Sequence, residues 1–224
     1  SPFHYGKVNH TGYLEISTLI EAYSNYLKSL NSFSNEGFNY NEIEFLENGI
    51  QYKNIQSKHI IFAEGFGLHA NPYFNDLPLD GTKGELLIIK APNLDLDVVI
   101  KSSVFILPIG NDLYKVGATY DWKDKTNTPT EEGKQELVDK LKEIISCDFE
   151  IVEHFGGVRP TVKDRRPLVG THPEFKQLHV LNGLGTRGVM LGPYLANQLF
   201  QHIENDIPLE KEIDIIRCYK KNRN

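Results

Sequence analysis

A glycine-rich turn lies near the C-terminus, in the stretch HVLNGLGTRGV at residues 179–189. The pattern indicates a strand, a turn that contains Gly183, Gly185 and Gly188, and then a helix. Glycine permits a positive φ and a close approach of the backbone. A helix that begins after such a turn directs unpaired N–H groups and a positive dipole end at whatever lies above it. The stretch therefore predicts a site for an anion or a polarised ring, with a connection that binds nothing as the alternative.

A second candidate is the arginine-rich stretch FGGVRPTVKDRRPLVG at residues 155–170. Arg159 follows a Gly-Gly pair and precedes a proline, at the expected end of a strand. A fixed arginine in a concave, partly apolar site is a common device for binding a carboxylate through two hydrogen bonds. The alternative is a structural salt bridge to Asp164 or another acid. Both interpretations stay open for Arg159, whereas for Arg165 and Arg166 we favour the salt bridge.

The first part of the chain is expected to contain one helix and several short strands. Apolar residues at helical spacing predict a helix over residues 14–30. Short strands at 42–46 and 49–54 flank a predicted hairpin turn. The run HIIFAEG at 59–65 is uniformly apolar, as a strand buried on both faces would be.

From residue 84 onward, short strands separated by polar turns predict a largely antiparallel sheet. We expect these strands at residues 84–90, 97–102, 104–110, 112–120 and 149–160. In the last third, the pattern predicts strands within 165–173 and 177–185 and a helix from about Gly188 to Glu204.

One helix is expected within the sheet region, from about Pro129 to Ser146. Thr128 and Glu131 fit a capping box, with Pro129 in the first helical position. On the outer face of this helix, Glu136 and Lys140 can form an ion pair.

Composition limits the classes of function. The chain has 224 residues, enough for one large domain or two small ones, and its net charge of -6 provides no basic field for nucleic acid. No apolar run reaches the roughly 20 residues that span a bilayer, and the first residues lack the apolar core of a signal peptide. We therefore expect a cytoplasmic protein that binds no nucleic acid, and the oligomeric state stays open.

Metal chemistry has little support in the sequence. Cys147 and Cys218 lie far apart, so neither a disulfide framework nor a cysteine zinc site is expected. The eight histidines include no H-x-x-x-H spacing. We predict no metal site.

The two C-terminal motifs together carry a resemblance to a known family. GGVRPTVKDRRPLVG, followed by LHVLNGLGTRGVMLGPYLANQL, resembles the D-amino-acid oxidase/glycine oxidase (DAO) family of FAD-dependent oxidoreductases. HIIFAEGFG is similar to that family's strand ending in A-x-G, and KGELLII and YKVGATYDW are similar to its substrate-domain strands. The resemblance extends over roughly residues 10–217 and corresponds to the C-terminal two-thirds of the family's fold.

The resemblance implies an α/β (α+β) fold with two lobes. Residues 1–82 and 157–224 would form a partial FAD-binding lobe. Residues 83–156 would form a largely antiparallel β substrate-binding lobe with a covering helix. The family opens with a strand–GxGxxG–helix unit that holds the ADP half of FAD, and this chain has no such motif. We therefore expect a fragment that lacks the N-terminal dinucleotide-binding unit, binds FAD weakly or not at all by itself, and is inactive alone.

The resemblance also implies positions for the cofactor FAD. The turn would place backbone amides at the pyrimidine edge of the isoalloxazine ring, where reduced flavin carries negative charge. These turn residues are Gly183, Leu184, Gly185, Thr186, Arg187, Gly188 and Val189. The stretch from Ala63 to Gly65 would run near the FAD diphosphate, and Gly157, Arg159 and Pro160 would lie beside the flavin.

Four residues are implied as substrate contacts. Arg159 would bind the substrate carboxylate, and Arg187 would be a second candidate near the substrate. Phe105 stands where glycine oxidase-like members tend to carry a tyrosine that touches the substrate. Tyr114 and Tyr120 are close to it in sequence, and we take Tyr120 as the second aromatic contact.

The intact protein is expected to oxidise the C–N bond of an amino acid or secondary amine by hydride transfer to flavin. This chemistry needs no side-chain base if the amine arrives neutral, so we assign no catalytic acid or base. One alternative is an FAD-dependent oxidase domain that acts on a modified tRNA base. Another is a degenerate, non-catalytic fold that binds a partner.

Overall fold

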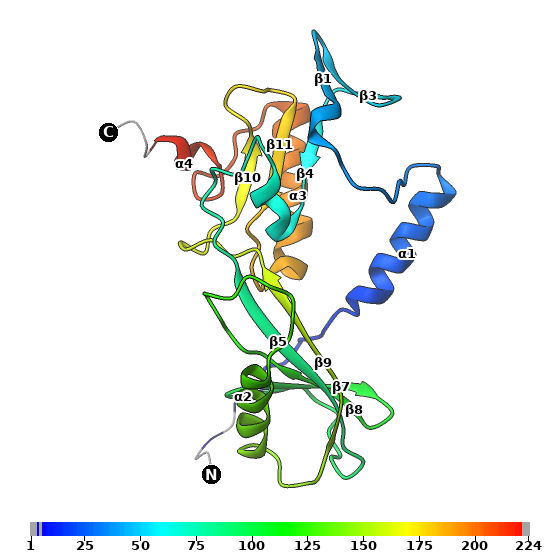
Figure 1. The fold of residues 1–224 in the computed structure, drawn as a ribbon, viewed down its shortest axis with the longest axis vertical. Coiled ribbons are helices and arrows are strands. Elements are labelled where there is room, and N and C mark those ends of the chain that lie inside the picture. The colour runs from blue at the N-terminus through cyan, green and yellow to red at the C-terminus, as the bar shows by residue number, and fades with distance from the viewer. Residues whose placement is uncertain (1–3, 5, 221–224) are drawn as a thin grey trace. The chain divides into compact units, whose positions relative to one another are not determined.

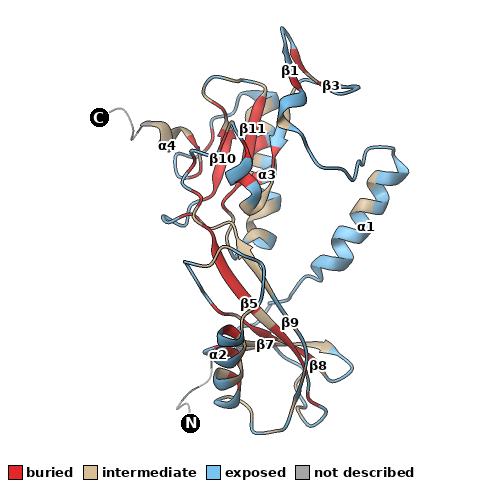
Figure 2. Ribbon diagram, viewed as in Figure 1, coloured by how far each residue is buried: buried red, intermediate tan, exposed pale blue. Residues whose placement is uncertain are grey.

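The computed structural model describes His4 and residues 6–220 (Figure 1). The chain divides into two compact units, Ser1–Glu42 and Ile43–Asn224. The first unit contains α1 (Ile16–Ser29) and the short 3-10 helix η1 (Tyr40–Glu42). The helix predicted over residues 14–30 is thus confirmed, and none of its residues is buried (Figure 2).

The described part of the second unit contains three sheets (Figure 1). An antiparallel ribbon is formed by β1 (Ile43–Leu46), β2 (Gly49–Tyr52) and β3 (Ile55–Ser57). A second sheet has the order β10 (Leu168–Thr171), β11 (Leu178–Asn182), β4 (Ile60–Phe62). The third has the order β6 (Ile100–Lys101), β7 (Phe105–Gly110), β8 (Leu113–Gly117), β5 (Thr82–Lys90), β9 (Glu150–Arg159). The helical segments are η2 (Gly65–Ala70), α2 (Glu131–Lys142), α3 (Gly188–Asn205) and α4 (Ile216–Lys220).

The third sheet is antiparallel throughout, which confirms the mixed α/β class and the antiparallel sheet expected from the sequence. The hairpin predicted around β1 and β2 is confirmed as well. The expected strand at 97–102 is shorter than predicted, because only Ile100 and Lys101 pair with β7. Strands β5 and β9 pair over their whole lengths, so both predicted lobe boundaries fall inside this pair. The division into lobes stays a prediction.

The core of the third sheet lies between its strands and α2. Buried apolar side chains of β5, β7 and β8 pack against Leu137 and Leu141 of α2. Figure 2 shows this burial along β5, and it continues in β10 and β11. In the second sheet, Val169 of β10 packs against Leu195 and Leu199 of α3. The second and third sheets therefore each pack against a helix of their own, α3 and α2 respectively.

The start of α2 differs from the predicted capping box. The helix begins at Glu131, and Thr130 is its N-cap, with the Thr130 hydroxyl accepting a hydrogen bond from the Gly133 N–H at 3.0 Å. The predicted role of Thr128 as cap was wrong because buried Glu85 accepts hydrogen bonds from both the N–H and the hydroxyl of Thr130. The helix also ends at Lys142, earlier than predicted.

Strand β4 is not buried on both faces, contrary to the expectation from its apolar run. Phe62 is 4% exposed, whereas its neighbour Ile61 is 51% exposed. Within the described residues, β4 is an edge strand and pairs only with β11, in a parallel register. Successive side chains of a strand point to opposite faces, so the face of β4 that carries Phe62 is buried and the face that carries Ile61 is exposed.

A chain of hydrogen bonds fastens the second sheet to the end of α3. His59 Nδ1 lies 3.0 Å from His179 Nε2, and His179 Nδ1 lies 2.9 Å from Thr171 Oγ1. Thr171 Oγ1 lies 3.2 Å from His202 Nε2, and His202 Nδ1 lies 3.1 Å from the Ile207 carbonyl oxygen. Because a carbonyl can only accept, neutral histidines donate in one direction, from His59 through to Ile207.

We expect this histidine chain to make the fold sensitive to acid. Burial, reinforced by His59 and His202, lowers the pKa of His179 to about 4 from its ordinary value. The unfolded chain then binds more protons than the folded chain between pH 6.5 and 4. The contribution of His179 to the free energy of unfolding is fully present above this window. It is lost as the pH falls through the window, and the loss is about 3 kcal/mol.

Urea unfolding measured across the same pH window tests this expectation. The His179→Gln variant should show a shallower loss of unfolding free energy on acidification than the unaltered chain. A loss of equal steepness in both proteins would assign the acid sensitivity to other groups.

Among the helices of the described residues, not one has the length and apolar character of a membrane-spanning segment.

Candidate functional site

The structure brings the two C-terminal motifs together. The Gly185 N–H donates to the Pro160 carbonyl at 3.0 Å, which joins the glycine turn to the end of β9. The Asn182 side chain donates to the Gly65 carbonyl at 2.9 Å, which joins the turn to the end of β4. Since β4 and β11 are parallel, this is the carboxyl end of both strands, where α/β folds bind ligands.

Two of the three glycines of the turn have the positive φ that the sequence suggested, whereas Gly188 is the first residue of α3. Gly183 and Gly185 have φ of 73° and 54°, in the left-handed region that favours glycine. Arg187 is the N-cap of α3, and its side chain makes no capping hydrogen bond. Within the described residues, the amides of Gly188 and Val189 have no hydrogen-bond acceptor, and the first turn contains no acidic residue. This helix end therefore favours a negative charge.

Of the other residues of the turn, one packs against the core and two are exposed to solvent. Leu184 packs against the apolar cluster beneath α3, so it contributes to the fold. Thr186 is exposed. The Arg187 side chain is also exposed, and its Nη2 donates to the Arg165 carbonyl at 3.3 Å, which ties the start of α3 to the preceding loop.

Arg159 ends β9 beside this turn. Its half-buried guanidinium donates from Nη1 to the Thr119 carbonyl at 3.3 Å. The Cζ atom lies 4.6 Å from the centroid of the Tyr120 ring, a cation–π contact. Burial lowers the pKa of Arg159, but arginine has so high an ordinary pKa that the side chain stays charged.

No carboxylate neutralises Arg159 within the described part of the chain. Asp164, the predicted alternative partner, instead lies 3.7 Å from Arg217 Nε and accepts a hydrogen bond from the Arg166 N–H at 3.0 Å. The salt bridges expected for Arg165 and Arg166 are absent from the described residues. Both side chains are exposed in the loop after β9, where solvation replaces an ion pair.

Phe105 lies on the same face of the third sheet as Arg159. Phe105 and Leu86 are both register partners of Gly117, so these residues form a row across β7, β8 and β5. Residues opposite each other, and residues two apart along a strand, share a face. Gly84 and Arg159 therefore follow Leu86 on this face, which is the face not covered by α2.

The structure separates the two tyrosines near Phe105. Tyr114 is 6% exposed, belongs to the core beneath α2, and donates its hydroxyl to the Leu94 carbonyl. Tyr120 is 64% exposed and lies against Arg159. Only Tyr120 of this pair is accessible to a ligand.

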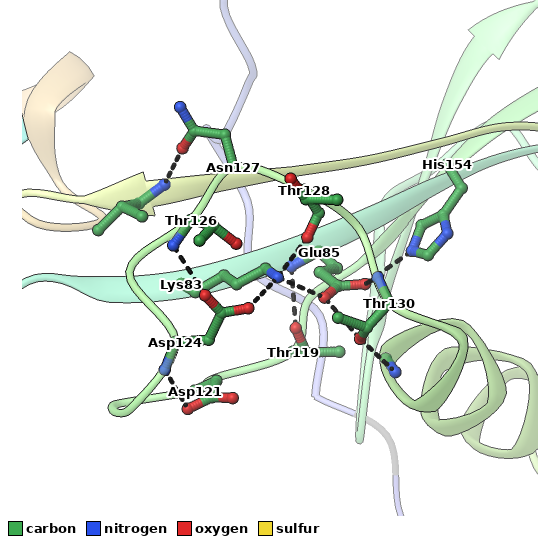
Figure 3. A network of polar contacts seen from close by, with 12 residues as sticks. Lys83, Glu85, Thr119, Asp121, Asp124, Thr126, Asn127, Thr128, Thr130 and His154 are labelled. Carbon is green, nitrogen blue, oxygen red and sulfur yellow. Dashed lines mark hydrogen bonds and ion pairs between the residues drawn. The ribbon is translucent and has the colours of Figure 1, made fainter.

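A buried charged network, which the sequence did not predict, lies on the opposite face (Figure 3). Lys83 is 1% exposed, and its ammonium lies 2.5 Å from Asp124 Oδ2 and 3.3 Å from Glu85 Oε1. It also donates to the Thr128 carbonyl. The hydrogen bond to Asp124 raises the pKa of Lys83 despite burial, and the same bond lowers the pKa of Asp124 to about 2.

Glu85 is the centre of this network. Its carboxylate accepts hydrogen bonds from the Thr130 N–H at 3.0 Å and the Thr130 hydroxyl at 2.9 Å, and it lies 2.8 Å from His154 Nε2 (Figure 3). Burial alone would raise the pKa of Glu85, but the bonds from Thr130, Lys83 and His154 lower it. The alternation Lys83-Gly84-Glu85, two opposite charges on one face of a buried strand, is the signal that could have revealed the network.

The network holds the loop that carries Tyr120. Lys83 binds this loop through Asp124 and Thr128, and the Asn127 side chain accepts from the Val158 N–H at 3.1 Å. Its members are fully engaged with one another, so we assign them to positioning the loop and α2. Across His4 and residues 6–220, no group of three His, Cys, Asp or Glu side chains could hold a metal ion.

The chain is similar to proteins of known family. A family model described as FAD dependent oxidoreductase matches residues 38–201. The chain is 27% identical over 188 residues to the tRNA 5-methylaminomethyl-2-thiouridine biosynthesis bifunctional protein MnmC of Marinobacter nauticus, covering 74% of this chain and 30% of that protein. It is 24% identical over 167 residues to glycine oxidase of Bacillus subtilis, covering 71% and 43%.

The fold is also found among solved structures. Iminodiacetate oxidase from Chelativorans sp. BNC1 superposes with a TM-score of 0.64 at 21% identity, covering 77% of this chain and 51% of that one. The chain spans about half or less of the length of the relatives that it matches. Since the matched residues 38–201 are more than half of the 224 in the sequence, the chain belongs to the FAD dependent oxidoreductase family.

Proposed function

We propose that this chain is part of an enzyme that oxidises the C–N bond of an amino acid or a secondary amine. The observation that carries the proposal is Arg159. It is a half-buried cation beside the glycine turn and has no carboxylate partner within the described residues. Such a cation is suited to the carboxylate of a substrate.

The residues around the turn fit FAD. The open amides at the start of α3 suit the electron-rich edge of a flavin. At Gly157 an added Cβ would meet no atom within 4 Å, so the space directly over this residue is open. FAD, when bound, would accept the hydride. The residues that would hold it are Ala63, Gly65, Gly157, Arg159, Pro160 and Gly183–Val189.

The chain's own residues would orient the substrate. Arg159 would fix the carboxylate, and this would set the direction of the adjacent C–N bond. Tyr120, which lies against Arg159, and Phe105, which is on the same face of the sheet as Arg159, would offer apolar surface to the substrate side chain. Arg187 would provide a second positive charge at the mouth of the turn. We assign no side-chain base, because a neutral amine needs none.

A visible absorption spectrum tests the proposed function. We expect the protein, supplied with FAD and any dinucleotide-binding region that its natural form contains, to show flavin bands. These bands should bleach on anaerobic addition of one or more members of an amino-acid panel. A protein that stays colourless after reconstitution with FAD would overturn the proposal and favour a non-catalytic binding fold.

A modified tRNA base is a second candidate substrate. It is supported by the 27% identity to a protein whose name places it in tRNA 5-methylaminomethyl-2-thiouridine biosynthesis. The same anaerobic experiment separates the two candidates. Bleaching by tRNA, with no response to any amino acid of the panel, would favour the tRNA base.

A further inference from the structure

Gly84 occupies an unusual place in β5. Its two neighbours, Lys83 and Glu85, direct buried charges toward the loop before α2 and its N-cap Thr130, so Gly84 belongs to the opposite face, the one shared with Arg159. A Cβ added at Gly84 would lie 1.9 Å from Arg159 Nη2 and 2.2 Å from both Cζ and Nη1. The guanidinium therefore occupies the space that any other residue at this position would fill.

The sheet register explains this contact. Arg159 is opposite Thr82, and Gly84 is opposite Gly157. The Arg159 side chain thus leans along the strand, from its own partner to the diagonal neighbour two residues on. Because Gly84 has no side chain, the guanidinium can lie directly against the backbone of β5.

Other contacts fix the guanidinium in this position. The Tyr120 ring lies 4.6 Å from Arg159 Cζ, and the Thr119 carbonyl accepts from Nη1 at 3.3 Å. Both residues belong to the segment that follows β8, so that segment and Gly84 together define where the positive charge is held. Without the Gly84 contact, the flexible arginine stem has many other rotamers available.

We propose that Gly84 is a positioning residue for Arg159. Its missing side chain seats the guanidinium against β5, and one added methyl group displaces it from the place where it would meet a substrate carboxylate. The inference rests on the proposed function for the identity of that ligand, but the placement of Arg159 by Gly84 can be measured independently of it.

The displaced atoms are the end of a flexible side chain, so Gly84→Ala should alter ligand binding without unfolding the chain. Gly157→Ala is the matched control for the position of Arg159. It adds the same methyl group at the register partner of Gly84, where a Cβ meets no atom within 4 Å.

The experiment uses the chain labelled with ¹⁵N and acetate as the probe. The Arg159 Nε–Hε resonance is identified by its absence from Arg159→Lys. We expect it to lie at a shifted position because of the Tyr120 ring, and to move in a saturable way as acetate is added. Gly84→Ala should return this resonance toward the position of a solvated arginine and weaken acetate binding by about tenfold or more. Gly157→Ala should leave the resonance in place.

The outcomes separate the two proposals. If Gly84→Ala leaves the resonance in place and acetate affinity within twofold, the positioning role is wrong, while the carboxylate role of Arg159 stands. In another outcome, acetate does not bind the unaltered chain, and the resonance is displaced in Gly84→Ala and not in Gly157→Ala. The positioning role is then supported and the carboxylate role fails.

A double variant covers the case in which Gly84→Ala does not fold. Adding Arg159→Ala removes the three atoms nearest to the new methyl group, so the double variant should fold as well as Arg159→Ala alone. Failure of the double variant to fold would mean that Gly84 is required for another reason and would overturn the proposal.

Discussion

Replacing Arg159 with alanine is expected to lower kcat/KM for an amino-acid substrate by about 100-fold. The guanidinium is half-buried, positioned by Gly84 and Tyr120, and unpaired with any acid in the described residues. A carboxylate bound there gains a charge-assisted hydrogen bond worth about 3 kcal/mol. Since this contact is made in both the ground state and the transition state, most of the loss should fall on KM. Steady-state kinetics of the flavin-loaded protein measures it.

The control for Arg159→Ala is the uncharged amide of the same amino acid. Its kcat/KM should change only a few-fold, because it has no carboxylate to bind. Arg159→Lys should be intermediate, since lysine retains the charge without the planar fork. Replacing the exposed Arg166 with alanine should leave kcat/KM unchanged for both substrates. An equal loss for acid and amide would remove Arg159 from carboxylate binding.

Replacing Lys83 with methionine is expected to reduce the free energy of unfolding by about 3–5 kcal/mol. Methionine has a similar length but no charge, so the buried carboxylate of Glu85 would lose its cation. Asp124 would also lose the hydrogen bond that holds its loop. The energy of an ion pair depends on its burial. Removing one member of a buried pair is strongly destabilising, because it leaves the other charge buried without a partner. Urea unfolding at neutral pH measures the effect.

Lys140→Met is the matched control for Lys83→Met. Lys140 lies 2.5 Å from Glu136 in a pair that the sequence predicted, one turn apart on the outer face of α2. Such a pair contributes about 0.3–0.5 kcal/mol, because water solvates both groups when the pair is broken. Similar losses for the two variants would contradict the special role of the Lys83 network.

Local features of the site could be predicted from the sequence. Positive φ at Gly183 and Gly185, and a helix that begins at Gly188, follow from residue types within one short stretch. The antiparallel sheet follows from the alternation of its strands. These predictions depend on interactions between near neighbours along the chain, and such interactions can be predicted from the order of the residue types.

The partners of Arg159 could not be predicted, because the register of β5 against β9 decides them. Gly84 and Tyr120 are distant from Arg159 in the chain, and a shift of the register by one residue would place different residues beside it. The same limit applies to the Glu85–Thr130 contact, which moved the start of α2. Ile61 was misjudged because an apolar run does not show which strands are at an edge.

Strand β5 separates two requirements that proteins often have to meet with the same residues. Lys83 and Glu85 hold α2 and its loop from one face, while Gly84 and Leu86 belong to the face of Arg159 and Phe105. Changes among the side chains on the face that we propose binds substrate therefore need not disturb the charges that secure the helix. Within a lineage, such a strand allows substrate preference to diverge while the threshold of stability is kept, because selection can act on its two faces separately.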